Sequence, residues 1–199
     1  MCVGLADRIE LSAINRYLTF SLQQDDECPK LTCGIIADLS NSIGHKLDEY
    51  IDQYVPHLHA LLQSESVERK IKLAAIHVLG SLSLNSGDYF NTRYLNDTIQ
   101  IFNLAAHMSV SSVANFQNDP DSLEFLKRLR NEILEQYQTI LISVEESSEM
   151  QMKYSFKKNL GAICEFIKQT LQVDGFTDAE QMSNISQLIM DMATQYSSD

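Results

Sequence analysis

Apolar residues recur at helical spacing along most of the chain. Between Val67 and His107, two such segments flank a short polar break at 85–88. Their apolar stripes are Ile71, Ala74, Ala75, Val78, Leu79 and Leu82 in the first segment, and Tyr94, Leu95, Thr98, Ile99, Phe102 and Ala106 in the second. Gly87 can adopt the left-handed conformation that ends a helix, and Asp88 is suited to cap the next one. The pattern therefore predicts two helices joined by a tight turn.

The same hairpin occurs once more, directly before this one. The segment 35–40 (IIADLS) precedes the segment 78–83 (VLGSLS) by an offset of 43 positions, and Gly44 and Gly87 keep that offset. A helical hairpin of about 40 residues is the size of a HEAT or armadillo unit. One hairpin cannot bury its apolar face alone, so such units stack on one another. We predict an all-α fold, a right-handed α-α superhelix (HEAT-repeat solenoid) of about four helix pairs.

The rest of the chain fits one array over residues 1–199. Further helices are predicted at 11–23, 31–43, 47–63, 123–144 and 152–171, with a last one ending near Tyr196. The polar, serine-rich segment 109–121 predicts a long loop between helices. Residues 1–9 have the pattern of a helix end, since VGLAD echoes GIIAD at 34–38, and the last helix has no partner after it. We therefore expect a fragment that begins and ends inside a repeat.

Charge narrows the choice of partner. The chain carries 27 acidic and 15 basic residues, a net charge of −12, which weighs against a nucleic-acid surface and suits a basic protein partner. The alternative is that the acidity only keeps a solenoid soluble. The sequence has no run of 18 apolar residues and therefore predicts no membrane span. The lysines of the segment 152–171 fit a solvated face better than a phosphate or nucleic-acid site.

The sequence holds no pattern typical of catalysis. There is no GxGxxG, P-loop, GxSxG or HExxH motif, and the four cysteines form no CxxC pair. His57 and His59 are two positions apart on a predicted helix, so they point to different sides and are poorly placed to share a metal. We expect a binding protein with no cofactor, and not an enzyme.

Four segments, in order, resemble one known family. They are CGIIADLSNSIG (33–44), YIDQYVPHLHALLQSESVERKIKLAAIHVLGSL (50–82), YLNDTIQIF (94–102) and LRNEILEQYQTILIS (129–143). In sequence and spacing they are similar to the C-terminal HEAT repeats of the importin-β (karyopherin-β) family. The chain departs from that family in its much shorter length and in the absence of tryptophan. It also lacks the N-terminal repeats with which those receptors bind the GTPase Ran, so Ran binding is expected of a full-length receptor only.

The resemblance implies a fragment of a nuclear transport receptor, present in cytoplasm and nucleus and at the nuclear pore. The second helix of each pair would line a concave surface that wraps the basic importin-β-binding segment of importin-α, or other basic cargo. The first helices would face outward, where nucleoporins insert phenylalanine–glycine side chains. The alternative is a HEAT-repeat scaffold or adaptor unrelated to transport.

Two sets of candidate binding residues follow. The acids of the predicted second helices are candidates for contact with a basic partner, although their spacing alone also fits a solvated face: Asp48, Glu49, Asp52, Asp97 and Glu165. Asp48 and Asp52 are four positions apart and are expected to share a helix face. For nucleoporins the candidates are Ile76 and Leu84, which lie off the apolar stripe of their helix.

Overall fold

The computed structural model describes residues 10–176 and 178–196, and within these ranges all regular structure is helical. The α-helices are α1 (Leu11–Ser21), α2 (Cys28–Ile43), α3 (Asp48–Gln63), α4 (Arg69–Ser86), α5 (Asp88–Ser111), α6 (Pro120–Glu146), α7 (Met150–Lys157), α8 (Leu160–Asp174) and α9 (Ala179–Tyr196). Two short 3-10 helices, η2 (Gly44–Leu47) and η3 (Val113–Phe116), lie in the connections. In the described part of the chain, no helix is long and apolar enough to cross a bilayer.

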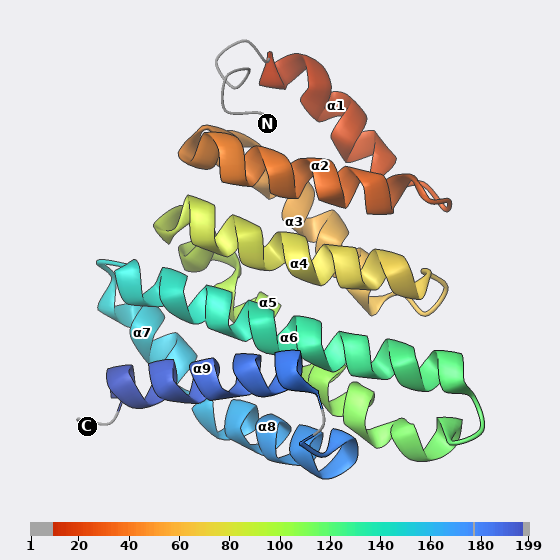
Figure 1. Cartoon of the computed structure of the whole chain (residues 1–199). Helices are drawn as coiled ribbons and strands as arrows, with labels where there is room; N and C mark the ends of the chain where they lie inside the picture. Colours follow the sequence, from red (N-terminus) through yellow and green to blue (C-terminus); the bar gives the residue numbers. More distant parts are fainter. Residues whose placement is uncertain (1–9, 177, 197–199) are drawn as a thin grey trace.

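The helices form two layers that run the length of the stack. In the first layer α2, α4, α6 and α9 pack side by side, and in the second layer α1, α3, α5 and the α7–α8 segment do the same (Figure 1). Each first-layer helix from α2 to α6 pairs with the second-layer segment that follows it, whereas within residues 10–176 and 178–196 α1 and α9 have no such pair. The predicted solenoid of helix pairs is confirmed. The prediction for residues 1–9 lies outside the described residues.

The core is densest around α4, which is enclosed by α2 on one side and α6 on the other. The predicted stripe residues Ile71, Ala75, Val78, Leu79 and Leu82 are all at most 4% exposed. Gly80 lets α6 approach closely, because a Cβ atom there would lie 1.9 Å from the Oε1 atom of the buried Gln136. Serine hydroxyls also join the layer: Ser40 Oγ donates to the Ser81 carbonyl (3.1 Å) and Ser143 Oγ to the Ser83 carbonyl (2.5 Å).

The two repeat glycines have nearly the same backbone conformation. Gly44 ends α2 at φ 52° and ψ −127°, and Gly87 ends α4 at φ 47° and ψ −122°. L-residues with a side chain rarely adopt these angles, so glycine is required where the chain reverses from the first layer to the second. The offset of 43 positions in the sequence thus corresponds to a turn that is repeated in three dimensions.

A buried ion pair ties the C-terminal part of the stack together. The Arg130 side chain is 2% exposed, and its Nε and Nη2 atoms donate to the two carboxylate oxygens of Asp174 at 2.7 and 2.5 Å. Its Nη1 atom donates to the Ser109 carbonyl at 2.6 Å, and Gln181 Nε2 donates to Asp174 at 2.9 Å. One guanidinium therefore joins α6 to the ends of α5 and α8, and through Asp174 to α9.

Three local predictions were wrong. The segment 109–121 is not one long loop, because α5 continues to Ser111, η3 follows, and α6 begins at Pro120. The single helix predicted at 152–171 is divided into α7 and α8, and at the break Asn159 Nδ2 donates back to the Ser155 carbonyl at 3.0 Å. Asp88 does not cap α5 with its side chain; its carboxylate instead accepts hydrogen bonds from Ser147 and Ser148.

The contact at Gly80 gives a test of the α4–α6 packing. We expect Gly80→Ala to lower the free energy of unfolding by about 1 kcal/mol, because overpacking a core typically costs about 1–3 kcal/mol and exceeds the gain in helix propensity. Gly34→Ala in α2 is the matched control, since a Cβ atom there meets nothing within 4 Å. It should raise the same free energy by about 0.5–1 kcal/mol. Urea unfolding measures both, and equal stabilisation by the two variants would contradict the close approach.

Candidate partner-binding surface

The side of the second layer that points away from the first layer, here called the free face, is lined by side chains of consecutive parallel helices. Lateral hydrogen bonds fix how these helices lie beside one another. Asn15 Nδ2 donates to Gln53 Oε1 (2.6 Å) between α1 and α3, and His59 Nε2 lies 3.0 Å from Thr98 Oγ1 between α3 and α5. On the far side of α5, Asn103 Nδ2 donates to Asn159 Oδ1 (3.1 Å) at the break between α7 and α8. These pairs show which residues of neighbouring helices lie at the same height along the helix axes.

Asp52 is the centre of a polar cluster between α3 and α5. Its carboxylate accepts hydrogen bonds from the hydroxyls of Tyr94 (2.8 Å) and Tyr89 (3.1 Å), and Arg93 Nε lies 3.9 Å away. The Arg93 guanidinium also sits 3.8 Å from the centre of the Tyr89 ring. Burial, together with the bond to Asp52, raises the pKa of Tyr94 to about 12, so the hydroxyl remains a donor. Half of the Asp52 side chain is still exposed, at 49%.

The other acids of α3 and α5 differ in how far they reach the free face. Glu49 and Asp97 are both exposed. Asp48 is not equivalent to Asp52: its side chain is 22% exposed, one carboxylate oxygen lies 3.4 Å from His45, and the other is buried without a hydrogen-bond partner among the described residues. Asp48 and Asp52 both belong to α3, four residues apart, but Asp48 is less accessible because its side chain lies against His45 of η2.

Glu165 does not continue the row that Asp52 and Asp97 begin. Asp97 lies six residues before Asn103, whereas Glu165 lies six residues after Asn159, the residue bonded to Asn103. At a rise of about 1.5 Å per residue, parallel helices separate the two carboxylates by about 18 Å along the helix axis. Glu165 instead bonds within its own helix, to Lys168 (3.4 Å) and Gln169 (2.9 Å).

The second-layer helix that lies beside Asp97 is α7, and this helix is basic. Lys153 corresponds to Asp97 in this register, and Lys157 and Lys158 follow one turn later. Lys158 Nζ lies 4.4 Å from the centre of the Tyr154 ring, and Tyr154 is 55% exposed. Lys158 is exposed, whereas Lys153 and Lys157 are half-buried, so the exposed charge next to the acids of α3 and α5 changes sign at the end of α7. From the sequence we expected these lysines on a solvated face. Their alignment with the acids of α5 was not predicted, because only the register of α5 with α7 reveals it.

The two nucleoporin candidates occupy different environments. Leu84 is 38% exposed near the end of α4, as expected, but Ile76 is fully buried. The expectation that Ile76 faces outward was wrong because α4 is covered by α2 and α6, and this covering buries Ile76 although it lies off the main stripe. Ile76 does line a hollow of about 570 Å³ where α5 ends and α6 begins. Sequence reasoning missed the other apolar residues of this hollow, among them Leu104, Met108, Phe116 and Phe125.

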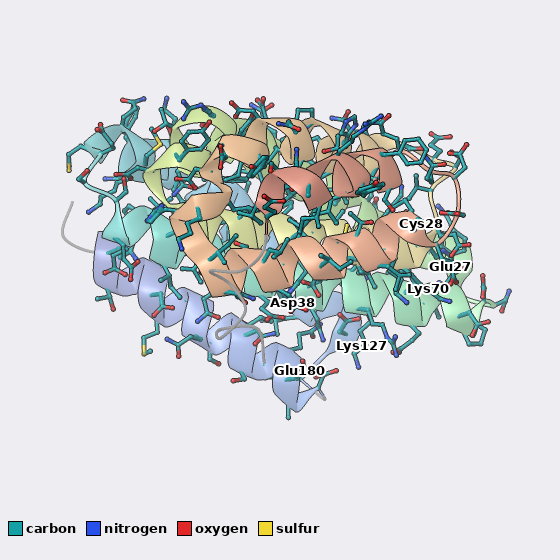
Figure 2. All side chains as sticks on the ribbon, turned by 90° about the horizontal axis from the view of Figure 1, so that it is seen from above. Glu27, Cys28, Asp38, Lys70, Lys127 and Glu180 are labelled. Carbon is teal, nitrogen blue, oxygen red and sulfur yellow. The ribbon has the colours of Figure 1, made fainter. Side chains whose placement is uncertain are left out.

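The first layer carries both signs of charge on its outer side. Asp38 of α2, Lys70 of α4, Lys127 of α6 and Glu180 of α9 lie along one side of the molecule (Figure 2). Lys127 Nζ is 2.7 Å from Asp178. Among the described residues no group of three or more His, Cys, Asp or Glu side chains is placed to hold a metal ion.

Comparison with known proteins agrees with the resemblance seen in the sequence. The family model "Importin subunit beta-1-like, TPR repeats" matches residues 11–199. This chain belongs to that family. It is 25% identical to importin subunit beta-1 of Saccharomyces cerevisiae over 163 residues, which are 81% of this chain and 18% of the relative. Importin subunit beta-1 of Schizosaccharomyces pombe is 24% identical over 132 residues, 66% of this chain and 15% of that protein.

Solved structures of importin-β have the same fold. The structure of yeast importin-β (Kap95p) superimposes with a TM-score of 0.78 at 22% identity, over 98% of this chain and 22% of that one. A structure describing how Kap95p binding changes the switch loops of RanGDP gives a TM-score of 0.81 with the same coverage. A non-specific serine/threonine protein kinase of Candida glabrata is 22% identical over 80% of this chain, which covers 11% of that protein. The chain thus spans less than a quarter of the length of these relatives.

Two histidines whose pKa values are shifted in opposite directions make the stability of the stack depend on pH. Burial lowers the pKa of His59 below 6.5, so below pH 6.5 the unfolded chain binds a proton that the folded one does not. Its contribution to stability is lost as pH falls. The hydrogen bond to Glu132 raises the pKa of His77 above 6.5, so its contribution is complete below pH 6.5 and is lost as pH rises through the folded-state pKa.

We expect urea unfolding at pH 7 and pH 5 to separate these contributions. His59→Gln, which keeps a polar group beside Thr98, should lose less stability than the parent protein between pH 7 and pH 5. His77→Gln should lose more over the same interval. Carboxylates away from the two histidines keep their surroundings in all three proteins, so the comparison with the parent protein is the control; Glu132 and Glu135 beside His77 and Asp97 beside His59 are the exceptions. A shift of both variants in one direction would contradict the assignment.

Proposed function

We propose that this chain is part of a nuclear transport receptor and that the free face of its second layer binds a basic segment of an importin-α-like adaptor or of cargo. The observation that supports this most is the pair of adjacent helices α3 and α5, whose free faces present Glu49, Asp52 and Asp97. Receptors of this kind act in the cytoplasm, in the nucleus and at the nuclear pore, and we assign the chain to the same route.

A helix laid across α3 and α5 meets these acids in succession. Neighbouring helices in a layer are about 8–10 Å apart, which corresponds to about six residues of a helical partner. Each exposed ion pair contributes only about 0.2–1 kcal/mol, so affinity depends on several contacts together. The Tyr89 and Tyr94 hydroxyls hold the Asp52 carboxylate in one place, which reduces the entropy lost when a basic side chain binds it.

The hollow that Ile76 lines supports a second contact, with phenylalanine–glycine nucleoporins. It has a volume of about 570 Å³, and Leu104 (57% exposed) and Met108 (54% exposed) border it. Ligand pockets are typically concave and mainly apolar, and this hollow has the size and lining to take an aromatic side chain. We assign nucleoporin binding to this hollow, which Ile76 lines, and not to an outward surface formed by Ile76 and Leu84, as the sequence had led us to expect.

Charge reversal tests the contact with a basic segment. Asp97→Lys should raise the Kd for a basic importin-β-binding peptide by about 3- to 10-fold, and Asp97→Asn by less, because reversal adds repulsion to the lost attraction. Raising the salt concentration should reduce the effect, since screening acts over about 8 Å at physiological ionic strength.

Asp97 is preferred to Asp52 for this test, because Asp52 also links α3 to α5 through Tyr89 and Tyr94. Glu124→Lys is the control: Glu124 lies on α6 in the first layer, 3.0 Å from Arg128. Titration calorimetry measures binding, and circular dichroism checks folding. If Asp97→Lys binds the peptide as tightly as Glu124→Lys does, the acids are a solvated face and the proposal is wrong.

A methionine pair tests the hollow. Met108→Ser should weaken binding of a phenylalanine–glycine repeat peptide by about 5-fold, since it removes a large part of the apolar area that the phenyl ring covers. Met190→Ser is the matched control, because Met190 on α9 has nearly the same exposure, 55%, and lies outside the hollow. Fluorescence anisotropy with a labelled peptide measures both variants. Equal affinities would assign nucleoporin binding, if any, to another surface.

A further inference from the structure

The free face of the second layer carries charges of opposite sign at neighbouring helices. Besides Asp88, which accepts hydrogen bonds from Ser147 and Ser148, the exposed acids of α3 and α5 are Glu49, Asp52 and Asp97. Arg93, an exposed base near them, is held by Asp52 and Tyr89. The three lysines at α7 follow Met150 within eight residues: Lys153, Lys157 and Lys158. The Asn103–Asn159 hydrogen bond places these lysines beside and just beyond Asp97.

The lysines of α7 also border an exposed apolar surface. Met150, Tyr154 and Lys158 are spaced four residues apart, so they form one stripe along α7. Met150 is 75% exposed and Tyr154 is 55% exposed. Apolar side chains as exposed as these, beside cations in a chain of net charge −12, are complementary to an acidic and apolar segment. We define this stripe, with Lys153 and Lys157 at its side, as the α7 stripe.

We propose that the second layer binds a helical segment that is basic over α3 and α5 and becomes acidic and apolar over α7. This inference rests on the proposed function, because it specifies the partner of the same surface. The spacing follows from helix geometry. One step between neighbouring helices is about 8–10 Å, or about six to seven residues of a bound helix. The partner carries basic residues that meet Asp52 and Asp97, and an acidic residue beside an apolar one about seven positions further on.

The reversal of sign fixes the direction of the partner. A purely basic helix laid across all three second-layer helices brings its last charges against the α7 lysines, and this repulsion opposes binding. A helix with an acidic end gains attraction at both ends only when that end lies over α7. The charge pattern therefore selects one orientation of the bound helix along the stack and rejects the opposite one.

Three synthetic helices of equal length, added to the full chain, test this proposal. They share one basic half and carry in the other half a glutamate–leucine, a glutamine–leucine or a lysine–leucine pattern. We expect the glutamate peptide to bind about 3- to 10-fold more tightly than the glutamine peptide, and the lysine peptide to bind more weakly than either. In Lys158→Glu the order of the glutamate and lysine peptides should reverse.

Lys70→Glu is the matched control for the same change of charge, because Lys70 lies on the first layer (Figure 2). It should leave the order of the three peptides unchanged. Single-stranded DNA is a fourth ligand, and we expect no binding that depends on Lys158. DNA binding that is lost in Lys158→Glu would overturn the proposal and assign the α7 stripe to nucleic acid.

Different outcomes test the α7 stripe and the basic contact on α3 and α5. If all three peptides bind with equal affinity, or if Lys158→Glu leaves their order unchanged, the assignment of the α7 stripe is overturned while the basic contact on α3 and α5 stands. If none of the three peptides binds, the proposed function is overturned together with this inference.

Discussion

The structure depends on one constraint: each helix pair has apolar surface on both sides and needs a neighbour on each. The helix α4 meets this condition most completely, because α2 and α6 cover it from opposite directions and most of its apolar stripe, from Ile71 to Leu82, is at most 4% exposed. Gly80 sets the separation on one side, where Gln136 occupies the space of the missing side chain. This first-layer packing also sets the spacing of the second layer, where the charged side chains lie.

The second layer is linked more loosely, by polar side chains instead of a continuous apolar face. Hydrogen bonds between α1 and α3, α3 and α5, and α5 and the α7–α8 break place each helix beside the next. In the Asp52 cluster the same carboxylate joins two helices and faces solvent, so a residue of such a link is also the one we propose for binding. A basic partner that binds Asp52 therefore contacts a group whose position the fold already holds.

Much of the architecture could be predicted because it is written as a repeat. The offset of 43 positions located the paired helices, and Gly44 and Gly87 marked equivalent turns that adopt the same φ and ψ. The break between α7 and α8 could not be predicted in the same way, because the apolar period continues across it and the nearby glycine, Gly161, lies inside the first turn of α8 and not at a positive-φ turn like Gly44 and Gly87. Ile76 was misplaced, and the low accessibility of Asp48 was not predicted, because a helical stripe is a local pattern, whereas their burial depends on α6 and on η2. The sign change on α7 depends on lateral register, which a single sequence does not contain.

The buried Arg130–Asp174 pair has a mechanical consequence. Separating α8 or α9 from α6 removes the partner of a guanidinium that is 2% exposed, and an unpaired buried charge costs about 3–5 kcal/mol. The links between α1 and α3 are hydrogen bonds between neutral amide side chains or between glutamine and histidine, which water replaces at little cost. We therefore expect the stiffness of the solenoid to differ along its length. Its curvature changes mainly between the N-terminal helices, while the C-terminal helices move together as one rigid body.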